Sequence, residues 1–171
     1  PTSQADMQRA LEEIGADSMD DCCFYGYESL VVPQLADCYG DNEEFDSLNL
    51  LAEKINRLNG DELVKYKAML EAAQCQDIET ALSVYEKMGD FSLDRSCGTA
   101  ADYADKMLDS TNLPIKEQLS TYLAKDGYGK AVMQLNGVDN TSYGMLIPDN
   151  GIRLSEQMQT QNNDMEMTIS M

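Results

Sequence analysis

The sequence predicts an α+β protein, with a helical bundle between two regions that mix helices and short strands. Two observations lead to this expectation. Apolar residues recur three and four positions apart in segments that open with a capping residue and close with glycine or asparagine, which predicts helices. Short apolar or aromatic stretches towards both ends of the chain predict strands. Hydrophobic residues make up 43% of the 171 positions, enough to bury a core despite the high charge.

The N-terminal unit is predicted to span residues 1–45. Its helix begins after Thr2 or Ser3, ends at Gly15, and has an apolar face made by Met7, Ala10, Leu11 and Ile14. Residues 22–27 are aromatic and flanked by acids, which favours a strand. Residues 30–39 are ambiguous, because Pro33 argues against a central strand.

Residues 46–89 are predicted to form the helical bundle. Asp46 or Ser47 begins the first helix, which closes at 59–60; Asp61 begins the second, and Asp77 begins a third that Gly89 ends. Each helix has one apolar face, as in the first, where the face consists of Leu48, Leu51, Ala52, Ile55 and Leu58. The short connections favour antiparallel neighbours.

The second α+β unit is predicted at residues 90–148. Residues 90–97 indicate a strand or an extended linker, Thr99 caps a helix, and Pro114 opens another. Two strands, at 130–135 and 143–147, are expected around the Asn136-Gly137 turn, with a longer loop as an alternative. Residues 149–171 are polar and rich in Gln, Asn and Met, which predicts a tail.

Negative charge is the strongest compositional signal. The chain has 12 basic and 31 acidic residues, a formal net charge of −19. No basic residue lies between Arg9 and Lys54. This charge argues against nucleic acid as a ligand, because phosphate binding needs clustered Lys and Arg. Two interpretations stay open: the acids are an ordinary solvated surface, or they meet a cationic partner.

The acids can be compared with the phosphates of a duplex. B-DNA carries one charge per ~1.7 Å of axis. Carboxylates four residues apart on a helix are separated by about 6 Å along its axis. Acidic helix faces and loops on an elongated body can therefore approach the spacing of the phosphates without reproducing it atom for atom. A Lys- and Arg-lined DNA groove would accept such a surface.

The sequence points away from catalysis and metal binding. It has no histidine, and it lacks nucleotide-binding and hydrolase motifs. The nearest approach to a calcium loop, residues 105–117, lacks the central glycine and carries Pro114. The five cysteines are odd in number and lack zinc-type spacing, so reduced thiols are expected. Because no signal peptide or long apolar run is found, we expect a cytoplasmic protein. Because catalytic and metal-binding motifs are missing, we expect that it is not an enzyme and needs no cofactor.

Several stretches, taken in order, resemble the ArdA antirestriction family. They are residues 1–15 (PTSQADMQRALEEIG), 22–28 (CCFYGYE), 45–72 (FDSLNLLAEKINRLNGDELVKYKAMLEA), 100–108 (AADYADKML) and 113–132 (LPIKEQLSTYLAKDGYGKAV), with Tyr143-Gly144 at the closing strand. The family's members are DNA mimics that inhibit type I restriction-modification enzymes. The chain lacks the strand with which the family usually opens, so the first unit is expected to be incomplete or differently built. It also has Ala104-Asp105 where the family commonly has Gly-Arg.

The resemblance implies an elongated chain of small units. It also implies competitive occupancy of the DNA-binding groove in a type I methyltransferase/specificity complex, without direct nucleic-acid or membrane binding and with a homodimer as one oligomeric state. The expected acidic face consists of Asp20, Asp21, Glu28, Asp41, Glu43, Glu44, Glu53, Glu62, Glu71, Glu79 and Glu86. No single member should be essential, because recognition of this kind is distributed. The alternative is an acidic adaptor that binds a basic protein unrelated to DNA.

Overall fold

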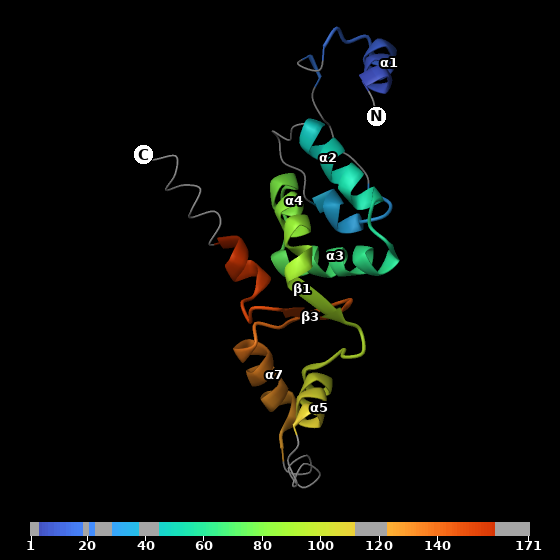
Figure 1. The fold of residues 1–171 in the computed structure, drawn as a ribbon. Helices are drawn as coiled ribbons and strands as arrows, with labels where there is room; N and C mark the ends of the chain where they lie inside the picture. The colour runs from blue at the N-terminus through green and yellow to red at the C-terminus, as the bar shows by residue number, and fades with distance from the viewer. Residues whose placement is uncertain (1–3, 19–20, 23–28, 38–44, 112–122, 160–171) are drawn as a thin grey trace, which may run out of the picture. The chain divides into compact units, whose positions relative to one another are not determined.

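A computed structural model describes residues 4–18, 21–22, 29–37, 45–111 and 123–159 (Figure 1). It confirms the α+β class, with helices and one three-stranded antiparallel sheet. In this described part of the chain, no helix is both long and apolar enough to cross a membrane. Two compact units emerge: unit 1 comprises residues 1–58 and 75–82, and unit 2 comprises residues 59–74 and 83–171. The division into three units and a tail stays a prediction.

Unit 1 contains α1 (Gln4–Ile14), the 3-10 turn η2 (Pro33–Asp37), α2 (Phe45–Asn56) and the first part of α4 (Ile78–Glu86). Helix α1 ends as predicted at Gly15, whose φ of +73° is a left-handed conformation that glycine adopts without strain. The ambiguous segment after residue 30 forms η2, in keeping with Pro33. Its buried side chains Val32 and Leu35 contribute to the apolar interior.

Helix α3 (Gly60–Ala73) begins one residue earlier than predicted. Asn59, rather than Asp61, is the capping residue, because its side chain accepts from the backbone N–H groups of Asp61 and Glu62, both at 3.0 Å. Asp77 precedes α4 as predicted, and its carboxylate accepts from the Thr80 backbone at 2.6 Å. Helix α4 ends at Glu86, and Gly89 lies in the following 3-10 turn η3 (Lys87–Asp90).

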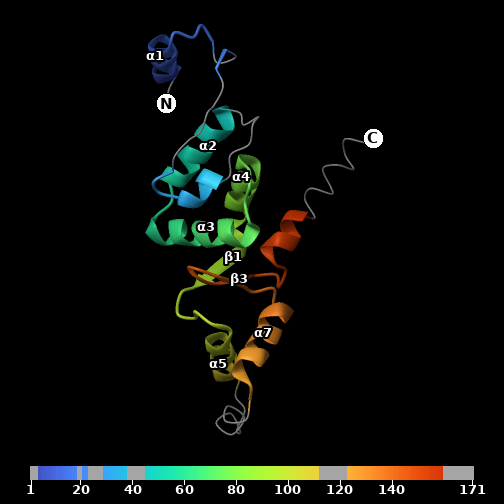
Figure 2. The same ribbon diagram turned by 180° about the vertical axis from the view of Figure 1, so that it is seen from behind.

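The sheet of unit 2 consists of β1 (Phe91–Asp94), β2 (Asp139–Thr141) and β3 (Gly144–Pro148) in the order β1-β3-β2. Both pairings are antiparallel, with Leu93 and Asp139 opposite Leu146 on its two sides. Helix α3 contacts all three strands. In both views of the ribbon, α3 and the pair α5 (Ala100–Ser110) and α7 (Lys125–Leu135) lie on opposite sides of the sheet (Figures 1 and 2).

Side chains from α5, α7 and β3 form one core cluster. Its buried members are Cys97, Ala100, Tyr103, Met133, Val138 and Met145, with Ile147 packed against them. Since side chains alternate along a strand, Leu146 points away from Met145 and Ile147. Leu146 is nevertheless fully buried, so β3 is covered on both faces.

Residues 130–135, predicted as a strand, belong to helix α7. The prediction was wrong because the half-buried Tyr128 and Val132 and the buried Met133 follow helical rather than alternating spacing. Asn136-Gly137 ends this helix instead of turning a hairpin, with Gly137 at a φ of +64°. The hairpin turn comes between β2 and β3, at Ser142 and Tyr143.

Within the segment predicted as a tail, residues 154–159 are helical and Leu154 is fully buried. Arg153 lies 3.5 Å from the Asp139 carboxylate on β2. One buried leucine and one ion pair do not form a repeating apolar pattern, so this helix could not be detected in the sequence. The strand expected at 22–27 lies almost entirely outside the described residues, as do the Pro114 helix and residues 160–171.

The contact between α5 and α7 gives a test of unit 2. A Cβ atom at Gly129 would stand 1.8 Å from the Ala100 carbonyl oxygen. Gly129→Leu should therefore force the two helices apart and lower the free energy of unfolding by several kcal/mol, to be measured by urea denaturation. Gly127→Ala is the matched control in the same helix, where a Cβ meets nothing within 4 Å, and it should stabilise by about 0.5–1 kcal/mol. Equal effects at both positions would contradict this packing.

Candidate acidic binding surface

The two units differ strongly in charge. Unit 1 has 15 acidic and 3 basic residues, a net charge of −12 in 66 residues. Unit 2 has 16 acidic and 9 basic residues, a net charge of −7 in 105 residues. Charge density is therefore much higher in unit 1. An acidic binding surface is best sought there.

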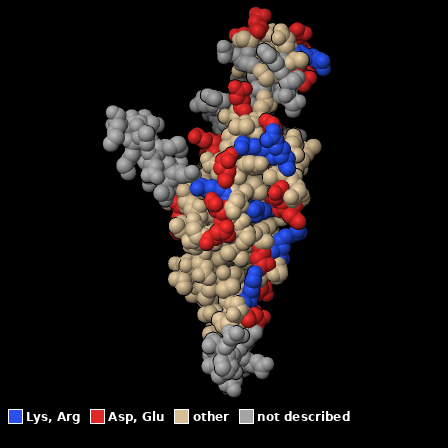
Figure 3. Space-filling model, in the orientation of Figure 1, with Lys and Arg blue, Asp and Glu red and all other residues tan. Residues whose placement is uncertain are grey.

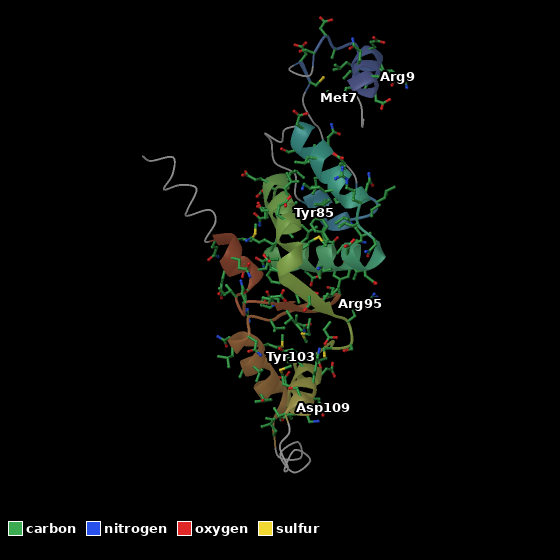
Figure 4. All side chains as sticks on the ribbon, viewed as in Figure 1. Met7, Arg9, Tyr85, Arg95, Tyr103 and Asp109 are labelled. Carbon is green, nitrogen blue, oxygen red and sulfur yellow. The ribbon has the colours of Figure 1, made fainter. Side chains whose placement is uncertain are left out.

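Acidic side chains gather on α1 and on the chain after it. Glu12, Glu13 and Asp17 are all exposed. Asp21 is exposed as well, and it accepts a hydrogen bond from the Ser18 hydroxyl at 3.1 Å. The described segments 4–18 and 21–22 contain one cation, Arg9, which is labelled in Figure 4. We call the four residues Glu12, Glu13, Asp17 and Asp21 the acidic α1 segment.

Three of the acids expected from the sequence lie in described parts of unit 1. Asp21 belongs to the acidic α1 segment. Glu53, on α2, pairs with Arg57 one helical turn later, but both side chains are well exposed, so the pair is weak. Glu79 is exposed in the first turn of α4, where a carboxylate also favours the helix dipole.

Three further expected acids lie in unit 2, and two of them have structural tasks. Glu62 accepts from the Asn59 backbone N–H at 2.9 Å and completes the cap of α3. Glu71 accepts from the Ser142 backbone at 2.8 Å and from its hydroxyl at 3.1 Å, which ties α3 to the hairpin turn. Glu86 is exposed at the end of α4.

The remaining expected acids lie outside the described residues: Asp20, Glu28, Asp41, Glu43 and Glu44. The six described ones come from α2, α3, α4 and the loop after α1. The expected face that joins all eleven stays a prediction.

In unit 2 many acids have a cation close by. Among the described residues, five ion pairs of 4 Å or less join them: Arg95–Asp61, Lys106–Asp94, Lys125–Asp105, Lys130–Asp126 and Arg153–Asp139. Lys65 instead donates to two backbone carbonyls, of Met88 at 2.7 Å and of Phe91 at 3.2 Å. In Figure 3, blue and red side chains lie close together at mid-height and along one edge of the molecule, beside a largely tan area. Five of the sixteen acids of unit 2 thus have a cation beside them in the described fold, and the unit keeps a net charge of −7.

Asp94, at the end of β1, shows how unit 2 uses an acid structurally. Its carboxylate accepts from Lys106 on α5, from the Ser96 backbone at 2.9 Å and from the Ser96 hydroxyl at 2.6 Å. These bonds, with that from Lys106 the largest, hold the pKa of Asp94 well below its usual range. Burial raises the pKa of the neighbouring Cys97 thiol, helped by its contact with Asp94. This thiol is therefore a poor nucleophile.

The sequence-based set did not include Glu12, Glu13 and Asp17. A signal for two of them was present, because Glu12 and Glu13 lie off the line of Met7, Leu11 and Ile14 on a helical wheel. Their position on the polar side of α1 could have been inferred from that spacing. Groups of three or more metal-ligating side chains are not found in the described segments.

Unit 1 also contains an apolar groove. Residues 29–35 contribute Leu30, Val31 and Leu35, and α2 contributes Leu48, Leu51 and Ile55. The groove encloses about 330 Å³. Leu35 and Leu51 are buried in it, while Leu30 is 91% exposed. The unit with the highest charge density thus also offers apolar surface.

The Asp94 cluster predicts a pH dependence of stability. The folded-state pKa of Asp94 lies below its unfolded value, so its contribution is present above the unfolded pKa of about 4 and is lost as pH falls through the folded value. At pH 7, Asp94→Asn should lower the free energy of unfolding by about 1–2 kcal/mol. The difference from wild type should shrink as pH falls below about 4. Asp90→Asn, at an exposed side chain, is the control. A difference that stays constant down to pH ~2 would contradict the assignment.

Comparison with protein-family models gives no match, and comparison with curated proteins gives none either.

Proposed function

We propose that the chain is a non-catalytic acidic protein that mimics the charge of DNA and occupies the DNA-binding groove of a type I restriction-modification enzyme. The observation that carries the proposal is the concentration of negative charge in unit 1, which contains 15 acidic and only 3 basic residues. The exposed carboxylates of the acidic α1 segment and Glu79 are described members of that set. The resemblance of several ordered stretches to the ArdA family is the reason for proposing a type I restriction-modification enzyme as the target.

Uncompensated charge of this kind is costly within the protein but favourable at an interface. Like charges repel one another in the compact state. A groove lined with Lys and Arg removes that repulsion and, as with DNA, releases bound counterions from both surfaces. Binding should therefore weaken steeply as salt concentration rises. It should also be spread over many carboxylates, none of them essential.

A second candidate is an acidic adaptor for a basic protein that does not handle DNA. The apolar groove of unit 1 favours this candidate, because a phosphate array presents no comparable apolar surface. Both candidates require a cationic partner. They differ in whether duplex DNA and the protein compete for the same site.

The first test neutralises four exposed acids in unit 1. The variant Glu12→Gln, Glu13→Gln, Asp17→Asn, Glu79→Gln should bind a type I methyltransferase/specificity complex about tenfold or more weakly, with a flatter dependence on salt, because counterion release is reduced. Binding would be measured by titration at several salt concentrations. The control Asp61→Asn, Asp90→Asn, Asp105→Asn, Asp126→Asn makes the same change in net charge, but three of its acids already have cations beside them. Equal losses in the two variants would contradict a localised surface.

The second test is competition with DNA. Duplex DNA should displace the wild-type protein from the restriction-modification complex, because the two occupy one cationic groove. Displacement would be measured with labelled protein at constant salt. Salt-dependent binding that DNA does not compete for would contradict mimicry and support the adaptor.

A further inference from the structure

The apolar groove of unit 1 has the dimensions of a binding site for large aliphatic side chains. The turn η2 and α2 lie side by side in both ribbon views (Figures 1 and 2). Leu35 and Leu51 are 3% and 2% exposed, whereas Leu30 and Val31 are 91% and 51% exposed. The hydroxyl of Ser29, a polar lining residue, accepts from the Val32 backbone at 3.1 Å. The groove therefore offers mainly apolar contacts.

The charge of the protein selects among occupants. A second copy of the chain has a net charge of −19 and would be repelled by unit 1, whose net charge is −12. Anionic lipid surfaces and nucleic acids would be repelled in the same way. Of the three bases in unit 1, Arg57 is already paired with Glu53. A cationic peptide is attracted by this field, and an amphipathic helix supplies the apolar anchors that such a groove can hold.

We propose that the groove formed by residues 29–35 and α2 binds the apolar side chains of a cationic amphipathic helix on a protein partner. Two leucines one helical turn apart would enter the groove, while lysines or arginines on the same helix are attracted by the net negative charge of unit 1. The inference rests on the proposed function in one respect, that the partner is cationic. It adds an apolar anchor, which charge mimicry alone does not require.

The test uses the full chain and three labelled peptides of about 14 residues. One is a lysine–alanine helix with two leucines four positions apart, the second has alanines in place of the leucines, and the third keeps the leucines but replaces lysine with glutamine. Binding is measured by fluorescence anisotropy. The leucine–lysine peptide should bind about tenfold or more tightly than its alanine twin, because each buried leucine contributes substantial apolar area. The glutamine peptide should bind more weakly than the leucine–lysine peptide.

Ala52→Trp fills the groove from an exposed lining position and should abolish the advantage of the leucines. Ala131→Trp, at an exposed position on α7, is the matched control and should keep it. Leu30→Asn is a second groove variant, at a side chain so exposed that folding does not depend on it. Circular dichroism checks the fold of each variant.

The outcomes separate the two proposals. Equal binding of the leucine–lysine and alanine peptides, or an undiminished advantage in both groove variants, would overturn the groove site and leave the cationic partner intact. An alanine peptide that does not bind even at low salt, together with a leucine–glutamine peptide that does, would overturn the cationic partner instead. A concentration-dependent dimer that Ala52→Trp abolishes, seen by sedimentation, would assign the groove to a second copy and overturn this inference.

Discussion

Unit 2 depends on the burial of strand β3, which pairs with both other strands and packs against helices on both faces. Leu146 is buried on one face, and Met145 joins the α5–α7 cluster on the other. Helices α5 and α7 approach each other closely at Gly129, which lets their side chains pack against Met145. Because the interior of this unit is largely apolar, most of its charged groups lie at the ends and outer faces of the elements, although the charged Asp139 and the polar Thr141 are largely buried. There, cations and carboxylates from different elements meet, as Lys106 and Asp94 do.

This arrangement explains why the charge is unevenly balanced along the chain. In unit 2 most of the described bases contact carboxylates or backbone carbonyls, and two acids, Glu62 and Asp102, complete helix caps. Unit 1 contains only 3 basic residues and 15 acidic ones, so its own bases are too few to offset the repulsion among its carboxylates. A cationic partner would relieve it. We therefore regard unit 2 as the structural scaffold and unit 1 as the binding region.

The local fold was largely predictable because helices are encoded by nearby residues. Helix α5 follows from Thr99 and its apolar spacing, and Thr99 does cap it. The strand predicted at 130–135 was wrong because the turn chemistry of Asn136-Gly137 also suits a helix end. For the candidate surface, the sequence identified the acidic residues but not the hydrogen bonds that some of them accept within the fold. The bond from Ser142 to Glu71 could not be foreseen, since it joins residues 71 positions apart. The cap formed by Glu62 could have been, because Asn59 and Glu62 have the spacing of a capping box.

The central claim is that negative potential is markedly stronger on unit 1 than on unit 2. It can be measured directly by nuclear magnetic resonance, from the relaxation that a cationic and a neutral nitroxide probe cause at each backbone amide. We predict a ratio of cationic to neutral effects that is markedly higher for α1, α2 and the first turn of α4 than for α5, α7 and the sheet. The excess should disappear at high salt, because exposed charges are screened. A ratio that is uniform along the chain, or highest over the sheet, would contradict the account.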